Sequence, residues 1–157
     1  MSEVARIQDQ LRRALDGDAW HGPALGELLR DVTAERAAAR PLPGGHTIWE
    51  IVLHIATWED VVQRRAEGEA VASVPDAVDW PLPAGGDGAA WDETRRRLAD
   101  VHRRLLDTIG GLDDARLEDR VPGKDQTLYV MLHGVVQHDL YHAGQIALLK
   151  RATAAAA

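Results

Sequence analysis

The chain has 157 residues, of which 45% are hydrophobic and 27% charged, and its 25 acidic and 18 basic residues give a formal net charge of −7. This length and balance are typical of one soluble globular domain and exclude a fibrous or disordered chain, while the spread of negative charge argues against nucleic acids and anionic membranes as partners. The sequence has no cysteine, which excludes disulfides, thiolate metal ligands and a protein thiol nucleophile.

Helical periodicity begins near the N-terminus. Apolar residues repeat at helical spacing from Val4 to Leu15, so we expect a first helix over about residues 3–16. A shorter apolar stripe and an Ala-rich run within residues 25–40 predict a second helical stretch, which ends before Pro41. Together these two segments can serve as one broken helix.

A long buried helix is expected from Thr47 to about residue 68. The sequence Thr47-Ile48-Trp49-Glu50 matches a capping box, in which the threonine hydroxyl and the glutamate carboxylate accept hydrogen bonds from free backbone amides. From residue 48 to 56 nearly every side chain is apolar except those of Glu50 and His54, so several neighbouring elements should bury this helix.

The following segment, residues 68–88, is rich in proline and glycine and predicts a long connection around Trp80-Pro81-Leu82-Pro83. Twenty extended residues reach about 66 Å, whereas a helix of 22 residues is only about 33 Å long. We therefore expect a crossover that lets the helices before and after it run parallel. We also expect its proline-rich part to border the mouth of a pocket.

Two more amphipathic helices complete the pattern. One is marked by apolar residues from Trp91 to Ile109, and the last extends from Leu128 to Leu149, capped by Asp125 or Thr127. No segment alternates between apolar and polar residues as a strand would, so the predicted class is all-α.

This pattern predicts a single domain over residues 1–153, followed by a disordered tail at 154–157. No apolar run is long enough for a transmembrane helix, and the N-terminal residues lack the order of a signal peptide. The expected location is therefore the cytoplasm.

Three histidines are the candidate metal ligands. His138 and His142 are four residues apart on the last predicted helix, so their β-carbons lie about 5–6 Å apart and both imidazoles can bind one zinc or nickel ion. By itself this spacing is equally typical of two unrelated histidines. His54 favours the metal site, because an unpaired imidazole in so apolar a helix would cost about 1–3 kcal/mol; a structural hydrogen bond would also satisfy it. Three neutral nitrogens would leave an open coordination position.

Three further residues are weaker candidates for the pocket. Glu50 precedes His54 by one turn but is favoured as a helix cap, Trp58 follows His54 by one turn and is favoured as a core residue, and Gln145 lies close to His138 around the last helix. The sequence His138-Asp139-Leu140-Tyr141-His142 lacks the glutamate of the H-E-x-x-H metalloprotease motif, which argues against a protease. The remaining histidines are treated as non-ligands: His21, His46, His102 and His133.

The chain resembles the DinB-like superfamily. The similarity rests on His54 with Trp58 in an apolar helix and on Val136-Gln137-His138-Asp139-Leu140-Tyr141-His142-Ala143-Gly144-Gln145-Ile146 near the C-terminus. This resemblance implies a four-helix bundle of up-down-down-up order, with one divalent metal ion held by His54, His138 and His142. Members of that family include thiol S-transferases and isomerases that use low-molecular-weight thiols, and others described as metal-dependent hydrolases.

The leading hypothesis is a metal-dependent enzyme, either a thiol S-transferase or a hydrolase, that acts on a small-molecule substrate. A low-molecular-weight thiol is a candidate cosubstrate, and a homodimer is the default assembly. The main alternative is a non-catalytic metal-binding or stress-associated helical bundle. A third reading is an interaction module that presents Trp20, Trp80 or Trp91 on its surface.

Overall fold

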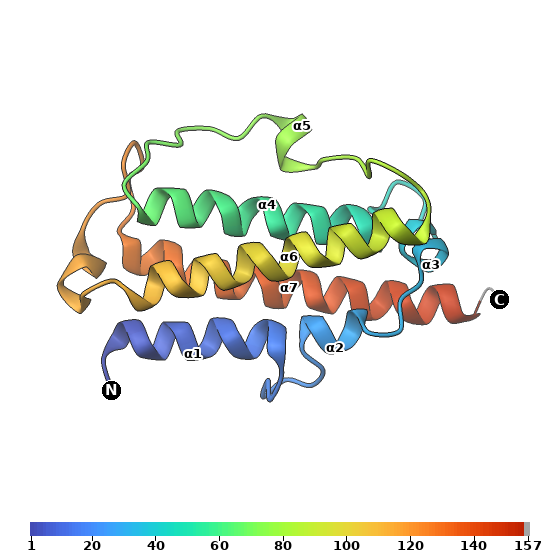
Figure 1. The fold of residues 1–157 in the computed structure, drawn as a ribbon, viewed down its shortest axis with the longest axis horizontal. Coiled ribbons are helices and arrows are strands. Elements are labelled where there is room, and N and C mark those ends of the chain that lie inside the picture. Colours follow the sequence, from blue (N-terminus) through green and yellow to red (C-terminus); the bar gives the residue numbers. More distant parts are fainter. Residues whose placement is uncertain (156–157) are drawn as a thin grey trace.

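The computed structural model describes residues 1–155, and helices are its extended regular elements (Figure 1). Within these residues the β-type pairing is one isolated antiparallel bridge between Arg120 and Thr127. The predicted all-α class is therefore confirmed. In chain order the elements are α1 (Glu3–Asp16), α2 (Leu25–Leu29), α3 (Ala34–Ala38), α4 (Ile48–Ala66), α5 (Asp76–Asp79), α6 (Gly88–Gly110), the 3-10 helix η1 (Asp114–Glu118) and α7 (Leu128–Ala155).

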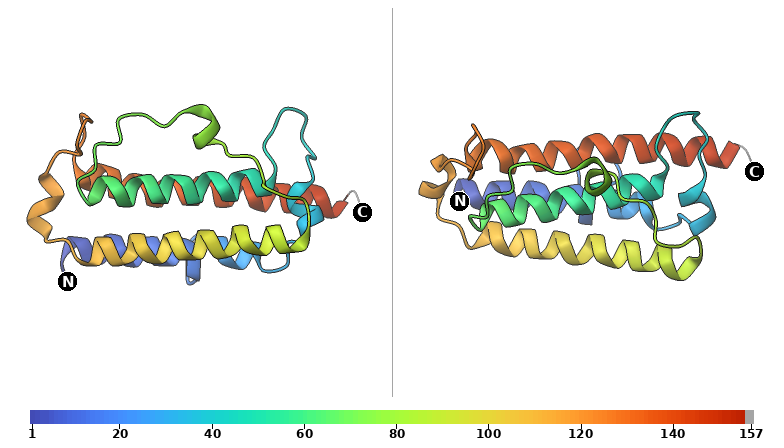
Figure 2. Two further views of the ribbon diagram at one scale, coloured as in Figure 1. Left: turned by 45° about the horizontal axis from the view of Figure 1, so that its top comes forward. Right: turned by 90° about the horizontal axis from the view of Figure 1, so that it is seen from above.

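The long helices lie alongside one another. Figure 1 shows α4 and α6 running in the same direction, with α1 and α7 running in the opposite one. Helix α4 packs against both α6 and α7, and α1 packs against the other sides of the same two helices. The crossover between α4 and α6 passes over the outer face of α4 in both views of Figure 2. Within residues 1–155, no helix combines the length and apolar character needed to cross a bilayer.

Local sequence signals set the helix ends that matter for the site. The Thr47 hydroxyl accepts a hydrogen bond from the Glu50 amide at 3.1 Å, and the Glu50 carboxylate accepts one from the Thr47 amide at 2.9 Å, which confirms the predicted capping box of α4. Thr127 caps α7, since its hydroxyl accepts from the Val130 amide at 3.3 Å. Helix α7 continues through Ala155, into the predicted tail, and residues 156–157 lie outside the described part.

Two buried tryptophans organise the half of the core near the start of α4. The Trp49 indole donates to the Thr94 hydroxyl at 2.8 Å, and the Trp91 indole donates to the Val32 carbonyl at 2.7 Å. Their rings meet edge to face with centroids 5.2 Å apart, a favourable geometry for aromatic pairs. Because Trp91 is only 2% exposed, the reading that placed it on an interaction surface is wrong.

Replacing Thr47 with alanine should lower the free energy of unfolding by about 1 kcal/mol, because the Glu50 amide loses its acceptor at the start of α4. Urea unfolding followed by circular dichroism measures the change. Thr47→Ser keeps the hydroxyl and serves as the control, with stability close to wild type. Equal stability of the alanine variant and the wild type would show that this cap contributes nothing.

Candidate metal centre

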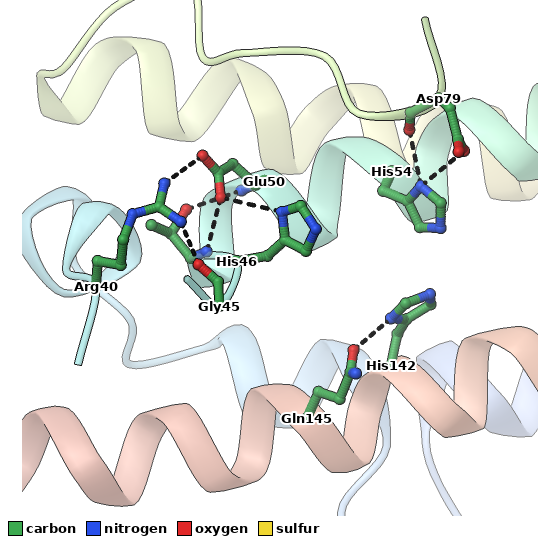
Figure 3. Close-up of polar contacts among 9 residues, drawn as sticks. Arg40, Gly45, His46, Glu50, His54, Asp79, His142 and Gln145 are labelled. Atoms are coloured by element: carbon green, nitrogen blue, oxygen red, sulfur yellow. Dashed lines mark hydrogen bonds and ion pairs between the residues drawn. The ribbon is translucent and has the colours of Figure 1, made fainter. Parts of the chain in front are cut away.

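Three histidine side chains from two helices converge in the structure. His54 comes from α4, and His138 and His142 come from successive turns of α7; one ligand atom from each lies within 4.8 Å of the others. The Nε2 atoms of His54 and His138 are 3.0 Å apart. Figure 3 shows the His54 and His142 rings facing each other across the space between α4 and α7. The three predicted ligands are thus brought together.

Hydrogen bonds select the tautomer of two of these rings. His54 Nδ1 lies 2.7 Å from the Asp79 carbonyl oxygen, and His142 Nδ1 lies 2.7 Å from the Gln145 side-chain oxygen (Figure 3). Both oxygens are acceptors, so each Nδ1 carries the hydrogen and each Nε2 keeps its lone pair. A ring held this way by a neighbouring oxygen is the usual arrangement of metal-ligating histidines.

Burial keeps the same two imidazoles neutral. It lowers the pKa of His54, although the carbonyl and carboxylate of Asp79 oppose part of the shift. Burial likewise lowers the pKa of His142, against the opposing hydrogen bond to Gln145. Metal binding requires unprotonated ligands, so both residues are prepared for it at neutral pH.

The donor set fits a divalent cation. Two imidazole nitrogens on a tetrahedral zinc ion lie about 3.4 Å apart, close to the observed separation of the His54 and His138 Nε2 atoms. Without an ion, one of these two nitrogens must carry a hydrogen, because otherwise their lone pairs would repel each other. The Nδ1 atom of His138 is buried without a hydrogen-bond partner, and its nearest carboxylate is that of Asp139 at 3.5 Å.

Trp80 covers one side of this centre. Its indole stacks on His54 with ring centroids 3.8 Å apart, and its other face stacks on His46 at 3.5 Å. The two interplanar angles are 7° and 3°, so the three rings form a nearly parallel sandwich. The expected placement of the proline-rich segment on the side of the histidines is confirmed for Trp80, although Trp80 is not among the residues that line the cavity beside them. The contribution of His46 was not foreseen, since its spacing from the other histidines carries no signal.

The unpredicted helix α5 explains how the crossover reaches the histidines. It ends at Asp79, whose backbone carbonyl accepts from His54 and whose Oδ1 accepts from the Trp58 indole at 2.6 Å. Trp58 is therefore a partly exposed wall residue, 6.2 Å from the His138 ring between centroids, and does not belong to the buried core. The preferred expectation of a core residue is wrong, because the Trp58 side chain is only partly buried and lines a cavity.

The other two weak candidates occupy different positions. Gln145 contacts the centre through His142, as a hydrogen-bond acceptor. Glu50 points away from His54 toward Arg40 and His46 (Figure 3). Burial would raise the pKa of Glu50, but the hydrogen bonds from Thr47 and Arg40 outweigh it and the net shift is downward. Glu50 is thus a cap and an ion-pair partner, and the structure does not bring it to the metal ligands.

A cavity of about 490 Å³ opens beside the histidines. It lies between α4 and the first turns of α7, and its walls include His54 and His138 together with Trp58 and Asp79. Val62 and Met131 supply part of its apolar surface. A mostly apolar cavity with a few polar groups at a metal-ligand set is the usual setting of a small-molecule site.

A second set of buried donors lies deeper in the bundle. Glu59 of α4, His102 of α6 and Asp139 of α7 place one ligand atom each within 4.8 Å of one another, and the three residues are between 1% and 2% exposed. His102 Nδ1 lies 2.7 Å from a Glu59 carboxylate oxygen. One sequence signal could have identified His102, which stands four residues after Leu98 and three before Leu105, on the apolar stripe of α6.

These carboxyl groups hold protons unusually strongly. Burial raises the pKa of Glu59 to about 8, and burial together with the charge of Glu59 raises the pKa of Asp139 to about 8. Burial lowers the pKa of His102, which also favours an uncharged side chain. The second set is therefore a proton-holding polar cluster at neutral pH, where a cation would have to displace protons to bind.

Replacing His138 or His142 with alanine should reduce bound metal from about one equivalent to nearly none, because the two remaining imidazoles no longer close a site. The helical circular dichroism signal should persist, since the core is apolar. Elemental analysis after dialysis against excess zinc measures the loss. His133→Ala is the matched control on the same helix, because His133 pairs with Glu3 outside the site. Full metal content in both site variants would contradict the assignment.

Replacing Glu59 with glutamine should make the free energy of unfolding less dependent on pH. Because the folded-state pKa is about 8 and the ordinary value is 4.5, the contribution of Glu59 is complete below about pH 4.5 and is lost as pH rises through 8. As pH rises from about 4.5 to 8, the free energy of unfolding of the wild type should therefore decrease relative to that of the variant. The decrease is at most about 1.4 kcal/mol per pH unit. Urea unfolding of chelator-treated protein at pH 5, 6.5 and 8 measures this slope. The surface variant Glu118→Gln should follow the wild type, and a parallel curve for Glu59→Gln would refute the expectation.

Comparison with known proteins places this arrangement in a family. The family model described as the DinB superfamily matches residues 19–146, a segment that includes all three candidate ligands, His54, His138 and His142. Searches of curated proteins and of solved structures give no match. The family match covers most of the chain and contains α4 and the part of α7 that carries the histidines. The chain therefore belongs to the DinB superfamily.

Proposed function

We propose that this protein binds one divalent metal ion through His54, His138 and His142 and is a metal-dependent enzyme that acts on a small molecule. The observation that carries the proposal is the convergence of three imidazoles beside a cavity of about 490 Å³. A structural metal site is normally closed by four protein ligands, whereas three ligands leave a position for substrate or water. The reaction classes that fit are thiol S-transfer and hydrolysis.

The ion would supply Lewis acidity, which lowers the pKa of a coordinated water or thiol. The protein's own residues orient and shield the ligands. Asp79 holds the His54 ring through its Nδ1 hydrogen, and Gln145 does the same for His142. Trp80 stacks over His54 and keeps water from that face. Because the chain has no cysteine, a thiol nucleophile would have to come from a low-molecular-weight cosubstrate.

Imidazole ligands favour zinc or nickel as the ion. For the fold, we infer the up-down-down-up four-helix bundle that the family resemblance implies, with α1, α4, α6 and α7 as its helices; the directions of these helices in Figure 1 support this order. The cytoplasmic location, the homodimer and the lack of nucleic-acid and membrane partners stay predictions.

The proposal is tested on protein purified without added metal. Elemental analysis should find about one equivalent of zinc or nickel, and a panel of thiol-transfer and hydrolysis substrates should reveal an activity. Chelation should reduce that activity more than about tenfold, and the same metal should restore it. His138→Ala is the inactive control and His133→Ala the active one.

The opposite outcome would favour the non-catalytic alternative. In that case chelation would unfold the protein, as expected for a stabilising ion, and no substrate of the panel would react in the metal-loaded protein. Thermal unfolding with and without chelator separates the two readings, because a catalytic ion in an apolar bundle should contribute little to folding.

A further inference from the structure

A buried arginine lines the cavity without a counterion. Arg65 is only 5% exposed, and its Nε and Nη2 atoms donate to a single backbone carbonyl, that of Val71, at 3.1 and 2.8 Å. Within residues 1–155 no ion pair to Arg65 is found, and burial is the one cause of its pKa shift, with no contribution from a carboxylate. Burial lowers the pKa of the guanidinium, which nevertheless stays charged because its ordinary pKa is so high. A buried, unpaired charge is unfavourable unless a ligand supplies the partner.

Arg65 shares the helix face that carries the candidate metal ligand. It follows His54 by eleven residues, which corresponds to about 20° of rotation and places both on one side of α4. Trp58 lies between them. The His54 ring centroid is 6.4 Å from that of Trp58, and the Arg65 Cζ atom is 5.8 Å from the Trp58 ring. The guanidinium is therefore no more than about 12 Å from the His54 ring.

The cavity beside the histidines contacts both His54 and Arg65. His54 and Arg65 belong to its lining, and between them the walls include Val62, Val130 and Met131. The other charged residue of the lining is Asp79, which is engaged with the Trp58 indole and lies 3.1 Å from His54 Nδ1. The cavity thus has metal-ligating nitrogens at one end, a cation at the other, and apolar surface between.

We propose that this cavity binds a small molecule with a carboxylate at Arg65, an apolar chain or ring beside Trp58, and its reacting group at the histidines. One negative charge matches one guanidinium, and part of the guanidinium remains free beyond the two groups that bind Val71. The position of the reacting group rests on the proposed function. The recognition of the carboxylate by Arg65 is independent of it.

The test compares two pairs of thiol ligands that differ only in charge. The long pair is 6-mercaptohexanoate and 6-mercaptohexanamide, and the short pair is 3-mercaptopropionate and 3-mercaptopropionamide. Isothermal titration calorimetry measures their binding to zinc-loaded and to chelator-treated protein. The wild type with zinc should bind the long carboxylate about tenfold more tightly than its amide. The short pair has three methylene groups fewer and should show a smaller preference, because a thiol held at the histidines leaves its carboxylate farther from Arg65.

Two variants locate the source of this preference. Arg65→Gln should reduce the ratio for the long pair to about one and leave amide binding nearly unchanged. Arg64→Gln is the matched control, since the neighbouring Arg64 is exposed and paired with Glu69, and it should keep the ratio. Should Arg65→Gln lose its helical circular dichroism signal, the comparison of long and short pairs in the wild type decides.

The outcomes separate the two proposals. A carboxylate preference that is absent, that persists in Arg65→Gln, or that is equal for the long and short pairs overturns the role of Arg65. If chelation leaves the affinity of both long ligands unchanged, the thiol does not bind a metal at the histidines and the proposed function fails. In that case a preference that disappears in Arg65→Gln still supports the carboxylate site.

Discussion

The hydrogen bond from His54 to the backbone carbonyl of Asp79 is the contact on which the site depends. His54 lies in the most apolar helix of the chain, where its ring needs a polar partner, and the crossover supplies one at 2.7 Å. This single contact fixes the tautomer of the ring, so that Nε2 faces the histidines of α7. It also holds the crossover against α4, which brings Trp80 onto the ring face and the Asp79 carboxylate to the Trp58 indole.

The polar groups of the interior are arranged in two neighbouring sets along the same helices. On α7, His138 belongs to the candidate metal centre, and the next residue, Asp139, belongs to the deeper cluster. On α4, Glu59 follows His54 by five residues. The outer set is kept neutral by burial and can accept a cation, whereas the inner set is kept neutral by holding protons. Each set thereby avoids an uncompensated charge in the bundle by a different route.

Arg65 breaks this pattern, since it carries a charge that burial cannot remove. Because Arg65 lies beyond Trp58, the two ends of the cavity differ: one carries the histidine nitrogens and the other carries the positive charge of Arg65. Membership of the DinB superfamily accounts for the histidines but leaves the substrate open. Under the proposed function, the charges of the cavity constrain the ligand where family membership does not.

Local patterns in the sequence determined the long helices, the cap at Thr47 and the two histidines that share a face of α7, because periodicity and capping depend only on neighbours along the chain. The same patterns placed His54 in a buried helix and so indicated that it needed a partner. They could not identify that partner. The residues between α4 and α6 lack periodicity, so nothing in their order predicts that α5 ends with Asp79 over His54.

The tertiary structure alone decided which buried faces meet. Periodicity gives each side chain an angle around its own helix axis but no distance to a residue on another helix. From the sequence, Trp91 could lie either in the core or on an exposed surface, and the packing of its N–H against the Val32 carbonyl places it in the core. For the same reason the sequence did not show that His102 meets Glu59. Nor did it show that Arg65 lines a cavity whose one carboxylate, that of Asp79, is hydrogen-bonded to Trp58 instead.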